Sequence, residues 1–338
     1  MKFINYKNLG LTGLANIGNT CYLNSCMQLL SHTYELNELL DKHKLELNNC
    51  VESNVYNEWN QLRKMMWSEN CSIAPYRFVK TIQEVSRVKS NIFTEFSQND
   101  VFEFLLFIID CFHESLKRKV KMNIHGTIKN NKDVLANKCY SMIKDVYNNE
   151  YSEIVTIFYG ISVTHINESS TKMNINIVAE PFSILSLCIP NTNRCSLAEC
   201  FDLYTKKEEL INENQIYSES KGTKVNAIKH ITFWSLPNVL IIELKRYTNS
   251  NTKLKTQIDA PLTDLDLSSY ISGYSPESYV YDLFGTGNHF GSTYGGHYTS
   301  NIKSPNGKWY CFNDNTITEL SEDKIINANT YSLFYRKK

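Results

Sequence analysis

The stretch from Gly10 to Leu30 constrains the fold of this chain more than any other part of its sequence. It joins a glycine-bounded loop directly to an apolar helical pattern, GLTGLANIGNTCYLNSCMQLL. Asn19 and Thr20 are residue types that favour the N-cap of a helix, and the residues behind them recur at helical spacing. The pattern therefore predicts a helix with Cys21 in its first turn.

A cysteine in the first turn of a helix is a candidate nucleophile. Unpaired backbone N–H groups and the positive end of the helix dipole favour an anion there, so we expect a lowered pKa for Cys21. Asn16 lies upstream in the glycine-bounded loop, where its amide could donate a hydrogen bond to a developing oxyanion. The alternative is a buried structural cysteine, and a matching base is needed to separate the two interpretations.

Two histidines near the C-terminus compete for the role of that base, His289 and His297. Residues Tyr298–Lys303 and Lys308–Phe312 are typical of strands, and the sequence SPNG between them is a turn signal. His297 directly precedes the first of these strands, whereas His289 lies in a glycine-rich loop. The predicted hairpin therefore favours His297.

The hairpin also predicts a partner for the imidazole. We expect Lys303 to face Gly307 across the turn. His297 then faces Asn313, and a one-residue change in turn length would place Asp314 opposite it instead. Facing side chains on neighbouring strands lie about 5 Å apart at Cβ. Either side chain could orient the imidazole, which is the arrangement that activates a nucleophile.

Glycines surround the predicted base. Gly291, Gly295 and Gly296 remove side chains from the approach to His297, so a slim substrate backbone could lie close to it. Tyr298, the next residue, is a further candidate for substrate contact.

A second helix is predicted by the broad apolar stripe in Phe96–Leu116, with Ser97 as its N-cap. Gln98, Asn99 and Asp100 would then fall in the first turn. Their amides and carboxylate could bind a passing peptide, although ordinary capping is an equally good explanation.

These stretches resemble the ubiquitin-specific proteases, the largest papain-like family of deubiquitinases. GLANIGNTCYLNS resembles the cysteine box of that family, and FSQND resembles its Gln-Gln-Asp box with Asn99 in place of the second glutamine. The resemblance implies that Gln98 and Asp100 contact the C-terminal tail of the substrate. It also implies that Asn313 is the third member of a Cys-His-Asn triad, with Asp314 supporting it or the oxyanion.

The resemblance runs through nearly the whole chain and implies one α+β catalytic domain, residues 8–338. Its papain-like fold would consist of a helical thumb (about 10–125), a β-sheet palm (about 180–190 and 236–338) and β-stranded fingers (about 155–235) inserted in the palm.

The sequence departs from the family where many members bind structural zinc. Those members carry one Cys-x-x-Cys pair shortly after the glycine that matches Gly160 and another just after the tyrosine that matches Tyr217. Here the two places are ISVTHINESS and SESKGTK, without cysteine. A closed zinc site needs about four Cys or His ligands, so we expect no metal and no cofactor. Core packing is the better explanation for the later cysteines, Cys188, Cys195 and Cys200.

Composition limits the other possibilities. The 35 basic and 35 acidic residues cancel, which argues against nucleic acid as a partner. No apolar run approaches the roughly 18 residues of a membrane span, so we expect no membrane association. The ten thinly spread cysteines suit free thiols in a reducing compartment. We expect a cytoplasmic monomer, with the nucleus as the alternative location because of the basic cluster 117–121.

The resemblance supplies ubiquitin as the partner and predicts a deubiquitinase. The enzyme would hydrolyse the amide or isopeptide bond after the C-terminal glycine of ubiquitin through an acyl-enzyme on Cys21. Three alternatives stay open: a protease for another ubiquitin-like modifier, a catalytically silent scaffold that binds ubiquitin, and a general papain-like endopeptidase, which the closed glycine loop argues against.

Overall fold

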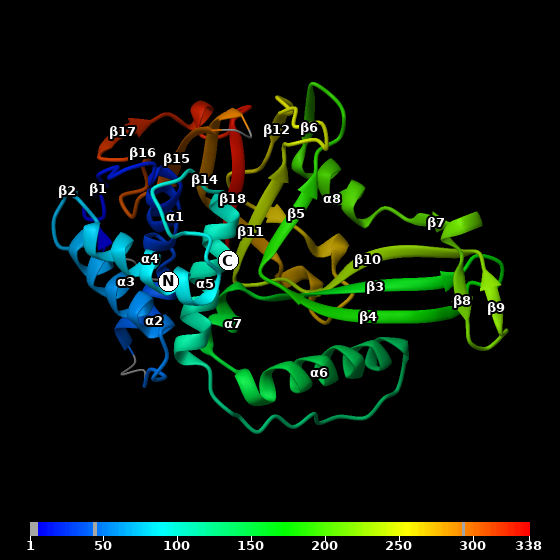
Figure 1. Ribbon diagram of the computed structural model, residues 1–338. Coiled ribbons are helices and arrows are strands. Elements are labelled where there is room, and N and C mark those ends of the chain that lie inside the picture. The colour runs from blue at the N-terminus through cyan, green and yellow to red at the C-terminus, as the bar shows by residue number, and fades with distance from the viewer. Residues whose placement is uncertain (1–5, 43–45, 293–294) are drawn as a thin grey trace.

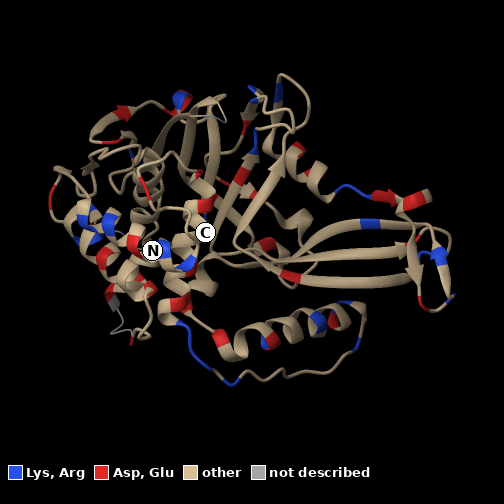
Figure 2. Ribbon diagram, viewed as in Figure 1, with Lys and Arg blue, Asp and Glu red and all other residues tan. Residues whose placement is uncertain are grey.

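The protein has three parts: a group of helices, a large sheet beside them, and a set of long strands that project away from both (Figure 1). The structure is a computed structural model that describes residues 6–42, 46–292 and 295–338. Figure 2 shows that acidic and basic residues are interspersed along the helices and strands seen in that view.

Helix α1 (Cys21–Ser31) confirms that Cys21 lies in the first turn of a helix, and all its side chains are buried. It packs against α5 (Val101–Leu116) and against three strands of the large sheet, β14 (Val280–Ser292), β15 (Gly295–Lys303) and β16 (Trp309–Asn313). The helix that carries Cys21 is therefore held between the helical part and the sheet.

The helical part encloses one apolar core, which includes the fully buried side chains of Trp59, Phe104 and Phe112. Its remaining elements are α2 (Tyr34–Lys42), α3 (Glu52–Met66), α4 (Tyr76–Lys89), α7 (Glu153–Phe158) and the short parallel pair β1 (Gly13–Leu14) and β2 (Ser72–Ile73).

The N-terminus of α5 differs from its prediction. The helix begins at Val101 and its N-cap is Asp100, not Ser97. The Asp100 carboxylate accepts hydrogen bonds from the backbone N–H of Phe102 at 2.7 Å and of Glu103 at 3.3 Å. A carboxylate satisfies these unpaired N–H groups and suits the positive end of the helix. Gln98 therefore lies before the helix rather than in its first turn.

The large sheet has the strand order β17-β16-β15-β14-β18-β11-β5, with β13 paired to β14. Its apolar strand β11 is buried between β18 and β5. The remaining strands are β5 (Ile184–Cys188), β11 (Val239–Lys245), β13 (Leu265–Asp266), β17 (Thr316–Leu320) and β18 (Thr330–Lys337).

The hairpin of β15 and β16 has a different register from the predicted one. Lys303 pairs with Trp309 rather than with Gly307, and the ladder ends at Ser300 and Phe312. The loop is closed by hydrogen bonds from Ser304 N to Lys308 O and from Gly307 N to Ser304 O. The turn takes up more residues than expected, so strict pairing does not place Asn313 opposite the predicted base.

The projecting sheet has the order β4-β3-β10-β7, and a separate hairpin of β8 and β9 lies at its far end (Figure 1). Helix α6 (Asn131–Glu150) packs on β4, with Leu135 and Cys139 in a small apolar cluster. The strands are β3 (Gly160–Glu168), β4 (Asn174–Phe182), β7 (Glu208–Leu210), β8 (Ile216–Ser218), β9 (Thr223–Val225) and β10 (Ala227–Ser235).

Several short elements lie between the longer helices and strands. They are β6 (Arg194–Ser196), which pairs with β12 (Gln257–Asp259), helix α8 (Leu197–Thr205) and the 3-10 turns η2 (Asn212–Asn214), η3 (Ser268–Tyr270), η4 (Pro276–Ser278) and η5 (Glu322–Lys324).

The ten cysteines are all free thiols. Cys195 and Cys200 are buried, as expected, but the prediction for Cys188 is wrong, because this side chain is exposed at the end of an outer strand. Within the described ranges, no helix has the length and apolar content needed to span a bilayer.

Glycine in β14 allows α1 to approach the sheet closely. A methyl group at Gly285 would lie 2.5 Å from Leu29 Cδ2. We predict that Gly285→Ala lowers the free energy of unfolding by about 1–3 kcal/mol through overpacking, and that Leu29→Ala lowers it by about 2–5 kcal/mol through a cavity. The double variant should lose less than the sum, because the new methyl group occupies space that Leu29 leaves. Chemical denaturation measures all three variants, and effects additive to within about 0.5 kcal/mol would contradict this packing.

Candidate active site

The loop before Cys21 is folded around the side chain of Asn16. Its Oδ1 accepts hydrogen bonds from the backbone N–H of Gly18 at 3.2 Å and of Thr20 at 3.1 Å. Asn19 has a left-handed backbone, with φ of 53°. Thr20 occupies the N-cap of α1 without a capping hydrogen bond from its side chain. The loop, and not a capping hydroxyl, therefore sets the start of the helix.

Burial decides the protonation of Cys21. The side chain is only 4% exposed, and this burial raises the pKa of the thiol, as does the nearby Asp314 carboxylate to a smaller extent. A backbone hydrogen bond from Tyr298 acts in the opposite direction. The expectation of a lowered pKa is therefore wrong for this structure, because desolvation exceeds the effect of the helix N-terminus.

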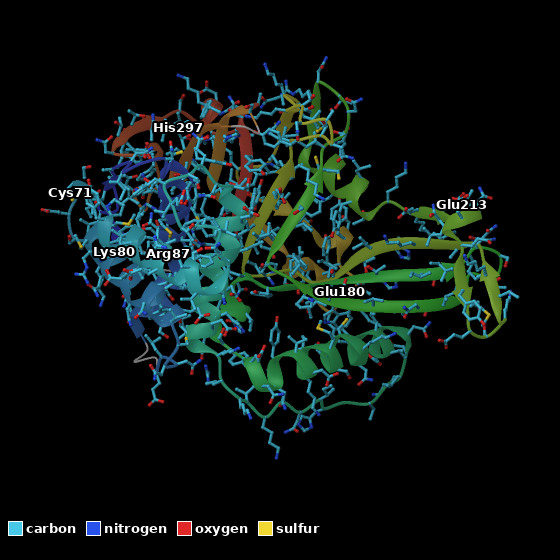
Figure 3. All side chains as sticks on the ribbon, in the orientation of Figure 1. Cys71, Lys80, Arg87, Glu180, Glu213 and His297 are labelled. Carbon is cyan, nitrogen blue, oxygen red and sulfur yellow. The ribbon has the colours of Figure 1, made fainter. Side chains whose placement is uncertain are left out.

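His297 and Asn313 come together despite the changed register. The Nε2 atom of His297 lies 2.6 Å from Asn313 Oδ1. Because an amide oxygen only accepts, this contact assigns the proton to Nε2 in the neutral ring and leaves Nδ1 as the free acceptor. Figure 3 shows His297 in the large sheet, far from Glu213 at the tip of the projecting sheet.

Helix α1 and strand β15 are in direct contact, and the Cys21 thiol is hydrogen-bonded to the backbone of Tyr298, the residue after His297. Within the described chain, however, no hydrogen bond joins the side chains of Cys21 and His297. The resting site therefore holds an oriented imidazole beside a buried thiol.

Asp314 links the loop of Asn16 to the hairpin. Its Oδ2 accepts a hydrogen bond from Asn16 Nδ2 at 3.1 Å, and its Oδ1 accepts one from Asn24 Nδ2 at 2.8 Å. Its backbone carbonyl accepts a third from Leu14 N at 3.0 Å. Asn16 has one N–H bond left on the same nitrogen, which is the geometry that an oxyanion donor needs.

Asn24 is a site residue that sequence reasoning missed. It also donates to the carbonyl of Leu14 at 3.1 Å, and it is 2% exposed. The available signal was a polar side chain one turn after Cys21, on a helix that is otherwise mostly apolar.

A cavity of about 230 Å³ adjoins the site, and its lining includes Gln98, Gly295 and Gly296. Gln98 spans it through two hydrogen bonds: its Nε2 donates to Gly296 O at 3.2 Å, and its Oε1 accepts from Gly296 N at 2.8 Å. A methyl group at Gly295 would lie 2.7 Å from Gln98 Oε1. Glycine is therefore required for this close approach.

Asp100 supports the cavity wall. Besides capping α5, it accepts hydrogen bonds through Oδ2 from Tyr331 at 3.1 Å and from Tyr298 at 3.5 Å. Burial is the main cause of the raised pKa of both tyrosines, so both hydroxyls are protonated donors. Of the predicted contacts, Gln98, Gly295, Gly296, Asp100 and Tyr298 all line the cavity.

His289 does not lie in a loop, as the sequence had suggested, but is buried within strand β14. Its Nδ1 lies 2.5 Å from the hydroxyl of Tyr247, and its ring lies 4.4 Å from that of Tyr298. Burial, assisted by Lys253, lowers the pKa of His289 to about 4. The ring is therefore neutral and packed into the cavity wall. Tyr247 and Tyr331 were not anticipated, because no local pattern marks them.

The arrangement can carry out nucleophilic acyl transfer. It contains a thiol, an oriented imidazole and an amide donor beside a narrow cavity, which are the groups that such a reaction needs.

Solved structures resemble this fold closely. One is the SAGA DUB module with Ubp8, Sgf11, Sus1 and Sgf73 bound to monoubiquitin, with a TM-score of 0.74 and 23% identity over 98% of this chain and 70% of that chain. Another is the same module bound to ubiquitin aldehyde, with a TM-score of 0.73 and 23% identity over the same shares. The predicted fold class is confirmed: α+β and papain-like, with the helical part as thumb, the large sheet as palm and the projecting sheet as fingers.

Sequence relatives span the same region. Ubiquitin carboxyl-terminal hydrolase Usp2 of Drosophila melanogaster is 31% identical over 98% of this chain. Ubiquitin carboxyl-terminal hydrolase 2 is 32% identical over 96% of the chain in Homo sapiens and 31% identical over 96% in Gallus gallus. The chain spans 35% of the Drosophila protein, 55% of the human one and 93% of the chicken one. The family model described as ubiquitin carboxyl-terminal hydrolase matches residues 12–335. The chain therefore belongs to the ubiquitin carboxyl-terminal hydrolase family.

Proposed function

We propose that the protein is a deubiquitinase, a cysteine-type ubiquitinyl hydrolase that cleaves the amide or isopeptide bond after the C-terminal glycine of ubiquitin. The observation that carries this proposal is the hydrogen bond from His297 to Asn313, 2.6 Å long. It fixes the imidazole and leaves Nδ1 available to take the proton of Cys21.

The reaction proceeds in two stages. His297 takes the thiol proton, and the Cys21 thiolate attacks the carbonyl carbon of the terminal glycine. Asn16 donates its remaining N–H to the resulting oxyanion. Collapse of this intermediate breaks the C–N bond, the amine leaves with the proton from His297, and ubiquitin stays on Cys21 as a thioester. His297 then deprotonates a water molecule, which attacks the thioester and releases the carboxylate and the free thiol.

The cavity at Gln98 is the proposed entrance for the ubiquitin tail. The two hydrogen bonds between Gln98 and Gly296 use a backbone N–H and a backbone C=O, which are the groups that an extended peptide also offers. A tail ending in glycines can therefore replace Gly296 as the partner of Gln98 without a side-chain clash at Gly295.

The proposed partner is ubiquitin or a ubiquitin conjugate, and the proposed active species is a monomer with residues 8–338 as one catalytic domain. A protease for another ubiquitin-like modifier and a silent ubiquitin-binding scaffold are two competing functions. The narrow cavity would suit any modifier with a slim tail, so the modifier itself must be tested.

We predict that ubiquitin carrying a C-terminal electrophile adds once to the protein, because the tail delivers the electrophile to Cys21. Intact mass measures the adduct, and Cys21→Ala should abolish it. Cys71→Ala is the matched control, since this exposed cysteine lies outside the site, and it should react normally.

Probes built on other modifiers run in parallel with ubiquitin. An adduct with one of them and none with ubiquitin would support the same mechanism but identify that other modifier as the substrate. If no probe reacts while ubiquitin still binds, the silent scaffold becomes the better account.

The link between Asn16 and Asp314 gives a second prediction. Asn16→Ala should lower kcat by about 100- to 1000-fold with little change in KM, because the oxyanion loses a donor. Asp314→Ala should lower kcat by less, and the double variant should be no slower than Asn16→Ala, because Asp314 acts through Asn16. Asp323→Ala, at a carboxylate in the exposed turn η5, is the control. If the fold-loss in kcat of the double variant equals the product of the two single losses, Asp314 does not act through Asn16.

The raised pKa of Cys21 predicts how the resting enzyme depends on pH. The thiolate is the reactive form, and a raised pKa means that the thiol dominates at neutral pH. Alkylation of Cys21 by iodoacetamide should therefore accelerate about tenfold per pH unit between pH 7 and 9. Peptide mass spectrometry follows Cys21, with exposed Cys71 as an internal reference. A rate that is already constant below pH 7 would instead indicate a preformed thiolate.

A further inference from the structure

At the tip of the fingers, one carboxylate connects the end of β3 to the hairpin of β8 and β9. Glu168 ends β3, and its Oε1 accepts a hydrogen bond from Lys221 Nζ at 2.5 Å and from Ser170 Oγ at 2.8 Å. Its Oε2 accepts from Thr171 Oγ1 at 2.9 Å. Lys221 lies in the turn between β8 and β9, 53 residues later in the chain. The ion pair therefore connects two segments that no local pattern brings together.

The two partners differ in exposure. The Glu168 side chain is 10% exposed, and that of Lys221 is 47% exposed. The three donors hold the pKa of Glu168 down at about 2, with Lys221 as the largest cause. The carboxylate is therefore ionised at neutral pH, and a buried charge of this kind is costly without its partners.

A second contact fixes the base of the same hairpin. Ser169 N donates a hydrogen bond to Asn226 O at 2.9 Å, next to the end of β9. The hairpin is thus held by the backbone at its base and by Glu168 at its turn.

These two segments are the places where many ubiquitin-specific proteases carry their zinc-binding cysteine pairs. The residues present here do not fit a metal. The Lys221 ammonium has no lone pair and would repel a cation, and the hydroxyls of Ser170 and Thr171 are not ligand types of structural zinc. In the described part of the chain, no three His, Cys, Asp or Glu side chains are grouped to hold a metal ion.

We propose that the ion pair of Glu168 and Lys221, with the hydroxyls of Ser170 and Thr171, cross-links the turn after β3 to the hairpin of β8 and β9 in place of a metal. Glu168 and Lys221 are thus positioning residues: they fix the fingertip against which ubiquitin binds. This last consequence rests on the proposed function, whereas the cross-link itself does not.

Hydrogen exchange of the free protein tests the cross-link. In Lys221→Met, the amides of residues 216–225 should exchange about three- to tenfold faster, because the turn loses its charged anchor. Lys224→Met is the matched control: this exposed lysine lies on the same hairpin, has no ion pair within the described chain, and should leave exchange unchanged. Glu168→Gln, which removes the charge from the other side, should accelerate the same amides.

Two results would overturn the cross-link. One is equal exchange in Lys221→Met and Lys224→Met. The other is one equivalent of zinc in the purified protein whose removal by a chelator accelerates exchange of residues 216–225.

Hydrolysis of a ubiquitin–fluorophore conjugate tests the consequence for substrate binding. Lys221→Met should raise KM about three- to fivefold and leave kcat unchanged, because the fingertip lies far from Cys21. If Lys221→Met exchanges faster but has an unchanged KM, the ion pair of Glu168 and Lys221 does not help to position ubiquitin. Wild-type protein that hydrolyses no ubiquitin conjugate would instead contradict the proposed function, and the exchange result would still decide the cross-link.

Discussion

The carboxylate of Asp314 connects the two ends of the chain, and the geometry of the candidate active site depends on this connection. Its side chain binds Asn16 and Asn24, which lie 298 and 290 residues away in sequence. One residue earlier, Asn313 orients His297. A single turn of the palm therefore contacts both the imidazole of His297 and the amide of Asn16, the proposed oxyanion donor, so a shift of this turn would move both together.

Burial also makes the thiol of the resting site less reactive. The enclosure that positions Cys21 also desolvates it, which raises the pKa of the thiol, while Gln98 in the cavity wall is already hydrogen-bonded to Gly296. Both conditions oppose reaction until something enters the cavity. The wall behind it is well fixed, because Asp100 caps α5 and binds the hydroxyl of Tyr331 at the same time.

The fingers show how a long projecting sheet can be stabilised with a small apolar core. Helix α6 covers it near the palm, whereas the tip has little apolar core and depends on polar contacts. A carboxylate with three donors is suited to that position, because each partner offsets part of the cost of burying the charge. Such a cross-link should weaken as salt is added, because mobile ions screen the partly exposed Lys221 charge.

The sequence by itself determined several local elements and the candidate residues of the active site. It predicted a helix with Cys21 in its first turn, and the predicted hairpin favoured His297 over His289 as the base. Only the tertiary structure decided the register of β15 and β16, the cap of α5 at Asp100, the protonation of Cys21, and the contacts of Asn24 and Lys221. The physical reason is that periodicity and turn signals depend on neighbours in sequence. Burial, register and ion pairing depend on segments that meet only when the chain has folded.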